Sequence, residues 1–270
     1  MTNLDEIKNS LKKRNPESHK GDYGKDLIVA GSAKMAGAAI LSSRAALRSG
    51  AGLIYVAANP DMYDVIHISN PEAVIVDRDL SNLEKYDAIL IGPGMGNTLE
   101  TKELLLNILT NYSGPLVMDA DCLNVISAYN LYTDVKKYKG PKVITPHTGE
   151  AFRLVKKKLD RSEMVDSLEE LLDSIVLLKG NNTIVKYKDK EYINHTGNPG
   201  MATAGMGDVL SGIIVSLIGQ GIEPFKATCL ASYVHGLSGD IVRDKIGEDG
   251  LIASDIIEAI PNTLKLIKEK

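Results

Sequence analysis

The chain has 270 residues, of which 44% are hydrophobic, and this composition is sufficient for one large core. Its formal net charge of −4 leaves no basic excess for nucleic acid or an anionic membrane surface. The two cysteines, Cys122 and Cys229, exclude a cysteine-rich metal site and a disulfide framework, and they favour a reducing cytoplasm. We expect one domain over residues 1–270, without a signal peptide or a membrane span.

Short apolar runs alternate with helical patterns, which is typical of a parallel sheet covered by helices on both faces. A short helix is expected within the first twenty residues. We predict strands at residues 27–30, 53–57, 73–76, 88–91, 116–118, 143–145 and 175–178. Helices are predicted at 37–49, 98–110 and 162–174, a hairpin from strands 183–187 and 191–195, and mostly helix from 207 onward.

Glycine, proline and charged residues follow the predicted strands directly, at residues 30–32, 92–96, 119–121, 145–150 and 179–180. In an open α/β sheet, ligands bind outside the carboxyl ends of the strands. Five separate segments therefore converge on one edge, which favours an enzyme or a ligand-binding site.

Two common phosphate-binding motifs are excluded by their spacing. The glycines of residues 31–37 stand one position too far apart for a P-loop, and Ala38 occupies the lysine position. The dinucleotide fingerprint requires a glycine where Asn97 stands. Residues 92–94 therefore form either a tight loop against a ligand or an ordinary turn.

A glycine-rich run at residues 197–208 precedes the apolar stretch 209–218. A helix start offers unpaired N–H groups and a positive dipole end, and glycines allow a phosphate to approach closely. Asp208 stands at the junction. It is interpreted either as a cap of the helix or as a catalytic carboxylate.

Taken together, these motifs resemble the ADP/ATP-dependent NAD(P)H-hydrate dehydratases, a branch of the ribokinase-like superfamily. The resemblance runs in order along nearly the whole chain, through residues 19–24, 30–32, 37–39, 48–52, 92–94, 119–121, 145–147, 178–180 and 197–208. It implies a three-layer α/β/α sandwich with a central, mostly parallel sheet and helices on both faces. It also implies a stand-alone dehydratase without the epimerase domain that many relatives carry.

The activity implied by the resemblance is a carbon–oxygen lyase reaction that repairs hydrated NADH or NADPH in its S form. The ring hydroxyl is phosphorylated by ADP or ATP, with Mg²⁺ as cofactor, and phosphate is then eliminated. The resemblance further implies a cytoplasmic homo-oligomer, often a tetramer. A small-molecule kinase of the same superfamily and a non-catalytic nucleotide-binding module are the alternatives. Turnover of hydrated NADH with ADP or ATP distinguishes the three.

By resemblance, Asp208 is the catalytic base and contacts the substrate together with Ala39, Gly94 and His147. The predicted nucleotide-binding residues are Lys179, Gly180, Asn181, Asn182, Thr183, Gly205 and Gly207. Simpler interpretations stay open: Lys179 as a solvated strand-end lysine, and Ala39 as a small residue that allows tight helix–sheet packing.

The metal ligands are left unassigned. Asp119, Asp121 and Glu150 are candidates for Mg²⁺ or for orienting Lys179, and helix capping is an equal alternative for each. The remaining histidines are not spaced as metal ligands. His19 lies in an entry motif. The other three, His67, His195 and His235, are interpreted as structural.

Two positions depart from the family pattern. Met206 stands where the family usually has threonine, so a side-chain contact to phosphate is lost while backbone donors remain. Thr148 stands where the family prefers proline, at a position that we expect in a loop.

Overall fold

A computed structural model describes residues 3–269, and its centre is one sheet of nine strands in the order β3-β2-β1-β4-β5-β6-β7-β8-β9. Neighbouring strands are parallel from β3 to β7, and the last two pairs are antiparallel. The strands are β1 (Lys25–Val29), β2 (Leu53–Ala57), β3 (Val74–Val76), β4 (Ala88–Ile91), β5 (Leu116–Met118), β6 (Lys142–Ile144), β7 (Ile175–Leu178), β8 (Thr183–Tyr187) and β9 (Lys190–Asn194).

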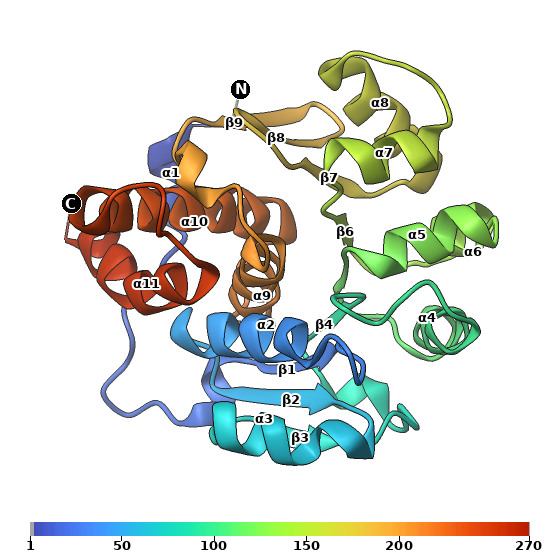
Figure 1. Cartoon of the computed structure of the whole chain (residues 1–270), viewed down its shortest axis with the longest axis horizontal. Helices are drawn as coiled ribbons and strands as arrows, with labels where there is room; N and C mark the ends of the chain where they lie inside the picture. Colours follow the sequence, from blue (N-terminus) through green and yellow to red (C-terminus); the bar gives the residue numbers. More distant parts are fainter. Residues whose placement is uncertain (1–2, 270) are drawn as a thin grey trace.

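Helices cover both faces of this sheet, which confirms the predicted three-layer α/β/α architecture (Figure 1). One face carries α1 (Leu4–Lys8), α2 (Ala36–Arg48), α3 (Tyr63–Ser69), α9 (Met206–Gly219), α10 (Pro224–Ile246) and α11 (Ala253–Lys268). The other carries α4 (Leu99–Asn111), α5 (Asp121–Ala128), α6 (Tyr132–Lys137), α7 (Thr148–Val155) and α8 (Arg161–Leu172).

The strands are apolar on both faces because each face packs against its own helical layer. In β1, Ile28 belongs to the core under α2 and α9, whereas Leu27 and Val29 belong to the core under α4 and α5. This alternation follows from the two-residue period of a strand. The buried residues of β1 and β4 therefore fix both the register of the sheet and the side on which each helix lies.

The strand order reverses between β1 and β4, which are hydrogen-bonded neighbours. The chain leaves β1 toward α2 on one face and leaves β4 toward α4 on the other. Such a reversal opens a crevice at the carboxyl ends of the two strands. The architecture thus places the motifs at 30–32 and 92–96 on either side of one opening.

The short helix expected within the first twenty residues is present as α1. Thr148, expected in a loop, instead begins α7. Proline is well tolerated at the first position of a helix, so the family preference at this position has a simple structural basis. The second strand of the hairpin runs from Lys190 to Asn194, one residue earlier than predicted. Among the described residues, no helix is both long and apolar enough to cross a membrane.

The motif at residues 19–24 lies at the amino end of β1, opposite the crevice. It forms the 3₁₀ turn η1 (Lys20–Tyr23), and the Gly52 N–H donates to the Tyr23 carbonyl at 2.9 Å. A Cβ at Gly52 would stand 1.8 Å from the Lys20 carbonyl oxygen, so only glycine fits there. Gly52 therefore allows the turn to pack closely against the start of β2. His19 lies on this side of the sheet, away from the carboxyl-end edge.

Candidate active site

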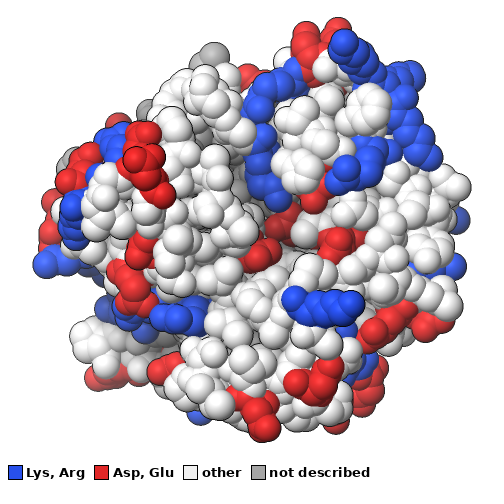
Figure 2. All heavy atoms as spheres, viewed as in Figure 1, with Lys and Arg blue, Asp and Glu red and all other residues white. Residues whose placement is uncertain are grey.

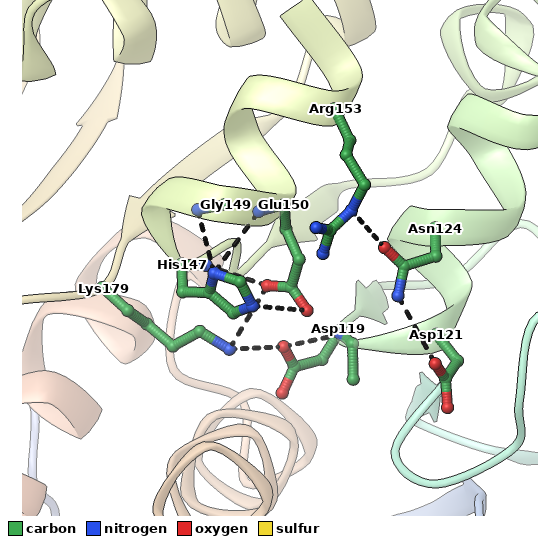
Figure 3. A network of polar contacts seen from close by, with 9 residues as sticks. Asp119, Asp121, Asn124, His147, Gly149, Glu150, Arg153 and Lys179 are labelled. Carbon is green, nitrogen blue, oxygen red and sulfur yellow. Dashed lines mark hydrogen bonds and ion pairs between the residues drawn. The ribbon is translucent and has the colours of Figure 1, made fainter. Parts of the chain in front are cut away.

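Three segments bring a cluster of charged side chains to the carboxyl-end edge (Figure 3). Asp119 follows β5, His147 and Glu150 stand at the start of α7, and Lys179 follows β7. Figure 2 shows acidic side chains gathered in the hollow at the centre of one face, with basic side chains along its border. The convergence predicted from the strand-end motifs is therefore present in the structure.

Lys179 is the hub of this cluster. Its Nζ lies 2.9 Å from Asp119 Oδ1 and 3.8 Å from Glu150 Oε2. The carboxylates are almost completely buried, with 1% and 6% of their side chains exposed, and Lys179 is 19% exposed. Burial lowers the pKa of Lys179, but the charges of Asp119, Glu150 and Asp208 outweigh it, so the pKa is raised overall. The lysine is a buried, fully charged cation rather than a solvated strand-end side chain.

His147 and Glu150 cap α7 reciprocally. His147 Nδ1 accepts hydrogen bonds from the N–H groups of Gly149 and Glu150, at 2.9 and 3.3 Å, and Glu150 Oε2 accepts from the His147 N–H at 2.8 Å. Because Nδ1 accepts, the neutral imidazole carries its proton on Nε2. The ring is 54% exposed, so its far side faces the solvent at the rim of the hollow.

The start of α9 approaches Lys179 and Asp119 closely. Gly205 is the N-cap with a φ of 87°, and Gly207 follows in the first turn. A Cβ at Gly207 would stand 3.3 Å from Lys179 Nζ and 3.9 Å from Asp119 Oδ2. The Met206 side chain is buried in the hydrophobic core. The absence of a side chain at Gly207 therefore brings the backbone of this turn close to the charged cluster, while the Met206 side chain packs in the core.

Asp208 does not cap the helix. It is the third residue of α9, the N-cap is Gly205, and no side chain caps this helix. Its carboxylate accepts no hydrogen bond from the described residues, and burial together with the charge of Asp119 raises its pKa to about 7, partly offset by Lys179. The capping interpretation of Asp208 is thus wrong. A half-buried carboxyl group that titrates near neutrality is suited to accepting a proton.

Asp121 holds the glycine loop at residues 92–96. Its Oδ2 accepts from the Gly96 N–H at 2.7 Å, and its Oδ1 accepts from Asn124, which itself accepts from Arg153 Nε at 2.9 Å. The N-cap of α5 is Ala120, so the proposed capping role of Asp121 is also wrong. Within residues 3–269, no group of three or more His, Cys, Asp or Glu side chains is arranged to hold a metal ion.

The predicted nucleotide segment, residues 179–183, is a loop held by side chains from both sides. Arg161 donates to the carbonyls of Leu178, Lys179 and Asn182 at 3.2 to 3.3 Å, and the His195 ring lies 2.8 Å from Asn182 Oδ1. Sequence analysis did not identify Arg161, because an arginine in the first turn of a helix gives no signal of what it reaches.

Gly94 and the first turn of α2 pack directly against each other. A Cβ at Gly94 would stand 2.7 Å from the Ala38 Cβ, and the φ of Gly94 is 64°. Ala39, one residue further, is 0% exposed and packs beneath Gly31. The methyl group of Ala39 belongs to the core, and the exposed part of this turn is formed by Gly37 and Ala38. The contact of Ala39 with the substrate stays a prediction.

His235 of α10 lies behind the start of α9. Its Nε2 is buried without a hydrogen-bond partner among the described residues, and burial lowers its pKa to about 4, partly offset by the backbone of Met206. The ring is therefore neutral at physiological pH.

The fold defines a class, the proteins with a ribokinase-like fold. Ribokinase from Thermotoga maritima superposes with a TM-score of 0.58 over 92% of this chain and all of its own, and at 12% identity this likeness concerns the fold alone. The model of the NAD(P)H-hydrate dehydratase family matches residues 27–262, and the chain belongs to that family.

Two relatives lie close in sequence or structure. The ADP-dependent (S)-NAD(P)H-hydrate dehydratase of Neisseria meningitidis is 36% identical over 92% of this chain and 88% of its own. The ADP/ATP-dependent dehydratase of Bacillus subtilis, co-crystallised with ATP and Mg²⁺, has a TM-score of 0.88 at 31% identity and covers 98% of this chain and 97% of its own. The chain spans about half the length of the bifunctional repair enzymes that it matches, such as 53% of the one from Thermofilum pendens.

Proposed function

We propose that this chain restores NADH or NADPH from the S form of its hydrate, with ADP or ATP as phosphate donor. Three features support the proposal: family membership, the likeness to the dehydratases of Neisseria meningitidis and Bacillus subtilis, and the site itself. The observation that carries it is Asp208, a carboxyl group with a pKa of about 7 at the start of α9, beside a buried lysine.

In this proposal, Asp208 accepts the proton of the ring hydroxyl as that oxygen attacks the terminal phosphate of the donor. The first turn of α9 presents backbone N–H groups, and Gly207 keeps the approach open for the transferred phosphoryl group. Lys179 supplies a fixed positive charge beside it. Loss of phosphate then breaks the ring C–O bond, and loss of a proton from the adjacent carbon restores the double bond.

Dinucleotide and donor occupy different sides of the hollow in this proposal. Gly94 and the exposed part of the first turn of α2 line the dinucleotide side, with His147 at the rim. The loop at residues 179–183 and the turn at 205–207 line the donor side. Mg²⁺ would neutralise donor phosphates when bound. Asp119 Oδ2, to which no described residue donates, is the oxygen placed to hold it.

The test is an assay of the purified chain with hydrated NADH and either ADP or ATP. Recovery of the reduced-nicotinamide absorbance is expected with at least one donor, and the donor that works settles the preference. Phosphorylation of a vitamin precursor without such recovery would instead assign the chain to the small-molecule kinases. The cytoplasmic location and the tetrameric state stay predictions, which cell fractionation and light scattering test.

A further inference from the structure

Arg78 is a buried arginine at the reversal of strand order. It follows β3, and only 8% of its side chain is exposed. Nη2 donates to the carbonyl of Ala30 at 2.9 Å and also to that of Gly31, and Nε donates to the carbonyl of Ala57 at 3.3 Å. The guanidinium of Arg78 is thus hydrogen-bonded to the carboxyl ends of both β1 and β2. Sequence analysis did not identify it, because it stands in no motif.

These carbonyls belong to the wall on the dinucleotide side. The Gly31 N–H donates to the Pro93 carbonyl at 2.7 Å, which ties the loop after β1 to the loop after β4. Gly94 then packs against Ala38. A continuous chain of contacts therefore runs from Arg78 through Gly31 to the glycine loop and the first turn of α2.

The polar partners of Arg78 are mostly uncharged. Its one carboxylate partner is Glu100, at 3.1 Å from Nη1, and that side chain is 53% exposed. An exposed carboxylate adds little energy to an ion pair, so the three carbonyl contacts set the position of the guanidinium. Arginine suits this task because its planar group holds several donors in a fixed arrangement.

A different arginine, Arg161, holds the loop on the donor side. Arg161 holds the carbonyls of Leu178, Lys179 and Asn182, and within residues 3–269 no hydrogen bond joins Arg161 to the loops that Arg78 holds. The two arginines therefore fix the two sides of the hollow independently. Removing one is expected to loosen the loops that it holds directly or through the Gly31–Pro93 hydrogen bond, and to leave the other side unchanged.

We propose that Arg78 is a positioning residue for the hydrated dinucleotide, which fixes the loop after β1 and, through the Gly31–Pro93 hydrogen bond, the loop after β4. This inference rests on the proposed function. It adds a residue whose loss should weaken the binding of the hydrated dinucleotide but not that of the nucleotide donor. Small displacements of a binding wall weaken the fit of a ligand strongly. A residue with a general structural role would affect both substrates alike.

The kinetic test compares Arg78→Met with Arg161→Met. We expect Arg78→Met to raise the KM for hydrated NADH by about tenfold or more while the KM for the nucleotide donor stays within about twofold. Arg161→Met should show the reverse pattern. Arg78→Lys should be intermediate, because one ammonium can donate to some of the carbonyls but lacks the fork.

Glu100→Gln is the matched control. It removes the ion pair and leaves the carbonyl contacts, so both KM values should stay within about twofold of the parent. Equal increases in the two KM values in folded Arg78→Met would overturn the proposal, as would an effect of Glu100→Gln as large as that of Arg78→Met.

Hydrogen exchange of the ligand-free protein gives a measurement independent of turnover. Faster exchange is expected at residues 31–35 and 92–96 in Arg78→Met, with residues 179–183 unchanged. Unchanged exchange in the first two segments would contradict the positioning role. Failure of the proposed function would appear separately, as absence of turnover in the unmodified chain with either donor. If Arg78→Met does not fold, Arg78→Lys carries both measurements.

Discussion

Buried carboxyl groups lie at both ends of the strands, but a neighbouring cation is present at one end and absent at the other among the described residues. At the carboxyl ends of the strands, Asp119 and Glu150 share the ammonium group of Lys179. At the amino end of β1, Asp26 is 0% exposed, and neither of its oxygens has a hydrogen-bond partner among the described residues. Burial, and secondarily the charge of Asp87, raises the pKa of Asp26 well above its ordinary value.

The comparison shows how one nearby cation changes the cost of burying a carboxylate. An isolated buried carboxylate is too costly to remain ionised, so Asp26 takes up a proton. Asp119 and Glu150 are buried too, but each has an oxygen within 4 Å of the Lys179 ammonium group, which offsets the cost of their burial. Asp208 is intermediate, because Lys179 offsets only part of the effect of burial and of Asp119 on its pKa. The balance of these effects leaves the pKa of Asp208 near neutrality.

The largest expected effect is the loss of turnover in Asp208→Asn. The amide keeps the shape of the side chain but cannot accept the proton, so kcat should fall by about a hundredfold or more. The fold should be at least as stable as the parent, because burial raises the pKa of Asp208 and the neutral amide avoids the cost of an ionised carboxylate there. Asp249→Asn, at an exposed position, is the control. Near-normal activity in Asp208→Asn would remove this residue from the mechanism.

Lys179→Met is expected to be the most destabilising change. It leaves Asp119 and Glu150 buried without their cation, which costs about 3–5 kcal/mol of unfolding free energy. Lys186→Met is the matched control, because Lys186 pairs with the half-exposed Asp166 on the surface and its loss should cost at most about 1 kcal/mol.

Adding Asp119→Asn to Lys179→Met should recover part of the lost stability, because one uncompensated charge is removed. Chemical denaturation measures all of these variants. If Lys179→Met cost no more than Lys186→Met, the charged cluster would contribute nothing to the fold.

Asp26 predicts how stability changes with pH. The unfolded carboxyl group ionises near pH 4, whereas the folded one keeps its proton to higher pH. Between these values the folded state binds more protons, so the unfolding free energy falls as the pH rises. Asp26→Asn should flatten this slope and raise the stability at pH 8 by roughly 1–3 kcal/mol, the scale of a buried polar penalty. A slope that the substitution leaves unchanged would assign the pH dependence to other groups.

Met206→Thr is expected to have the smallest effect on activity. The backbone N–H groups of the turn face the site whichever side chain is present, and the Met206 side chain lies in the core. The KM for the donor should change by less than about threefold, and the lost apolar contacts should cost on the order of 1–2 kcal/mol. A much lower KM for the donor in this variant would indicate that the threonine hydroxyl contacts phosphate after all.

The sequence predicted the sheet well because its parallel strands are short apolar runs separated by segments with a helical pattern. It also predicted where Lys179, Asp119 and Glu150 meet, because carboxyl ends of parallel strands share one edge. It could not predict which side a small residue faces, and Ala39 proved to be core. Arg78 gave no signal either, since its contacts join segments that are 20 to 50 residues apart in the chain.

The central claim, that Asp208 is a base whose pKa is set by burial and by Lys179, is tested most directly by the pH dependence of turnover. For the unmodified chain with hydrated NADH and a saturating donor, the rate should rise with pH and level off above a midpoint of about 7, because only the ionised carboxylate accepts the proton. A rate that is flat between about pH 5.5 and 8.5, or a midpoint near the ordinary aspartate value of about 4, would contradict it.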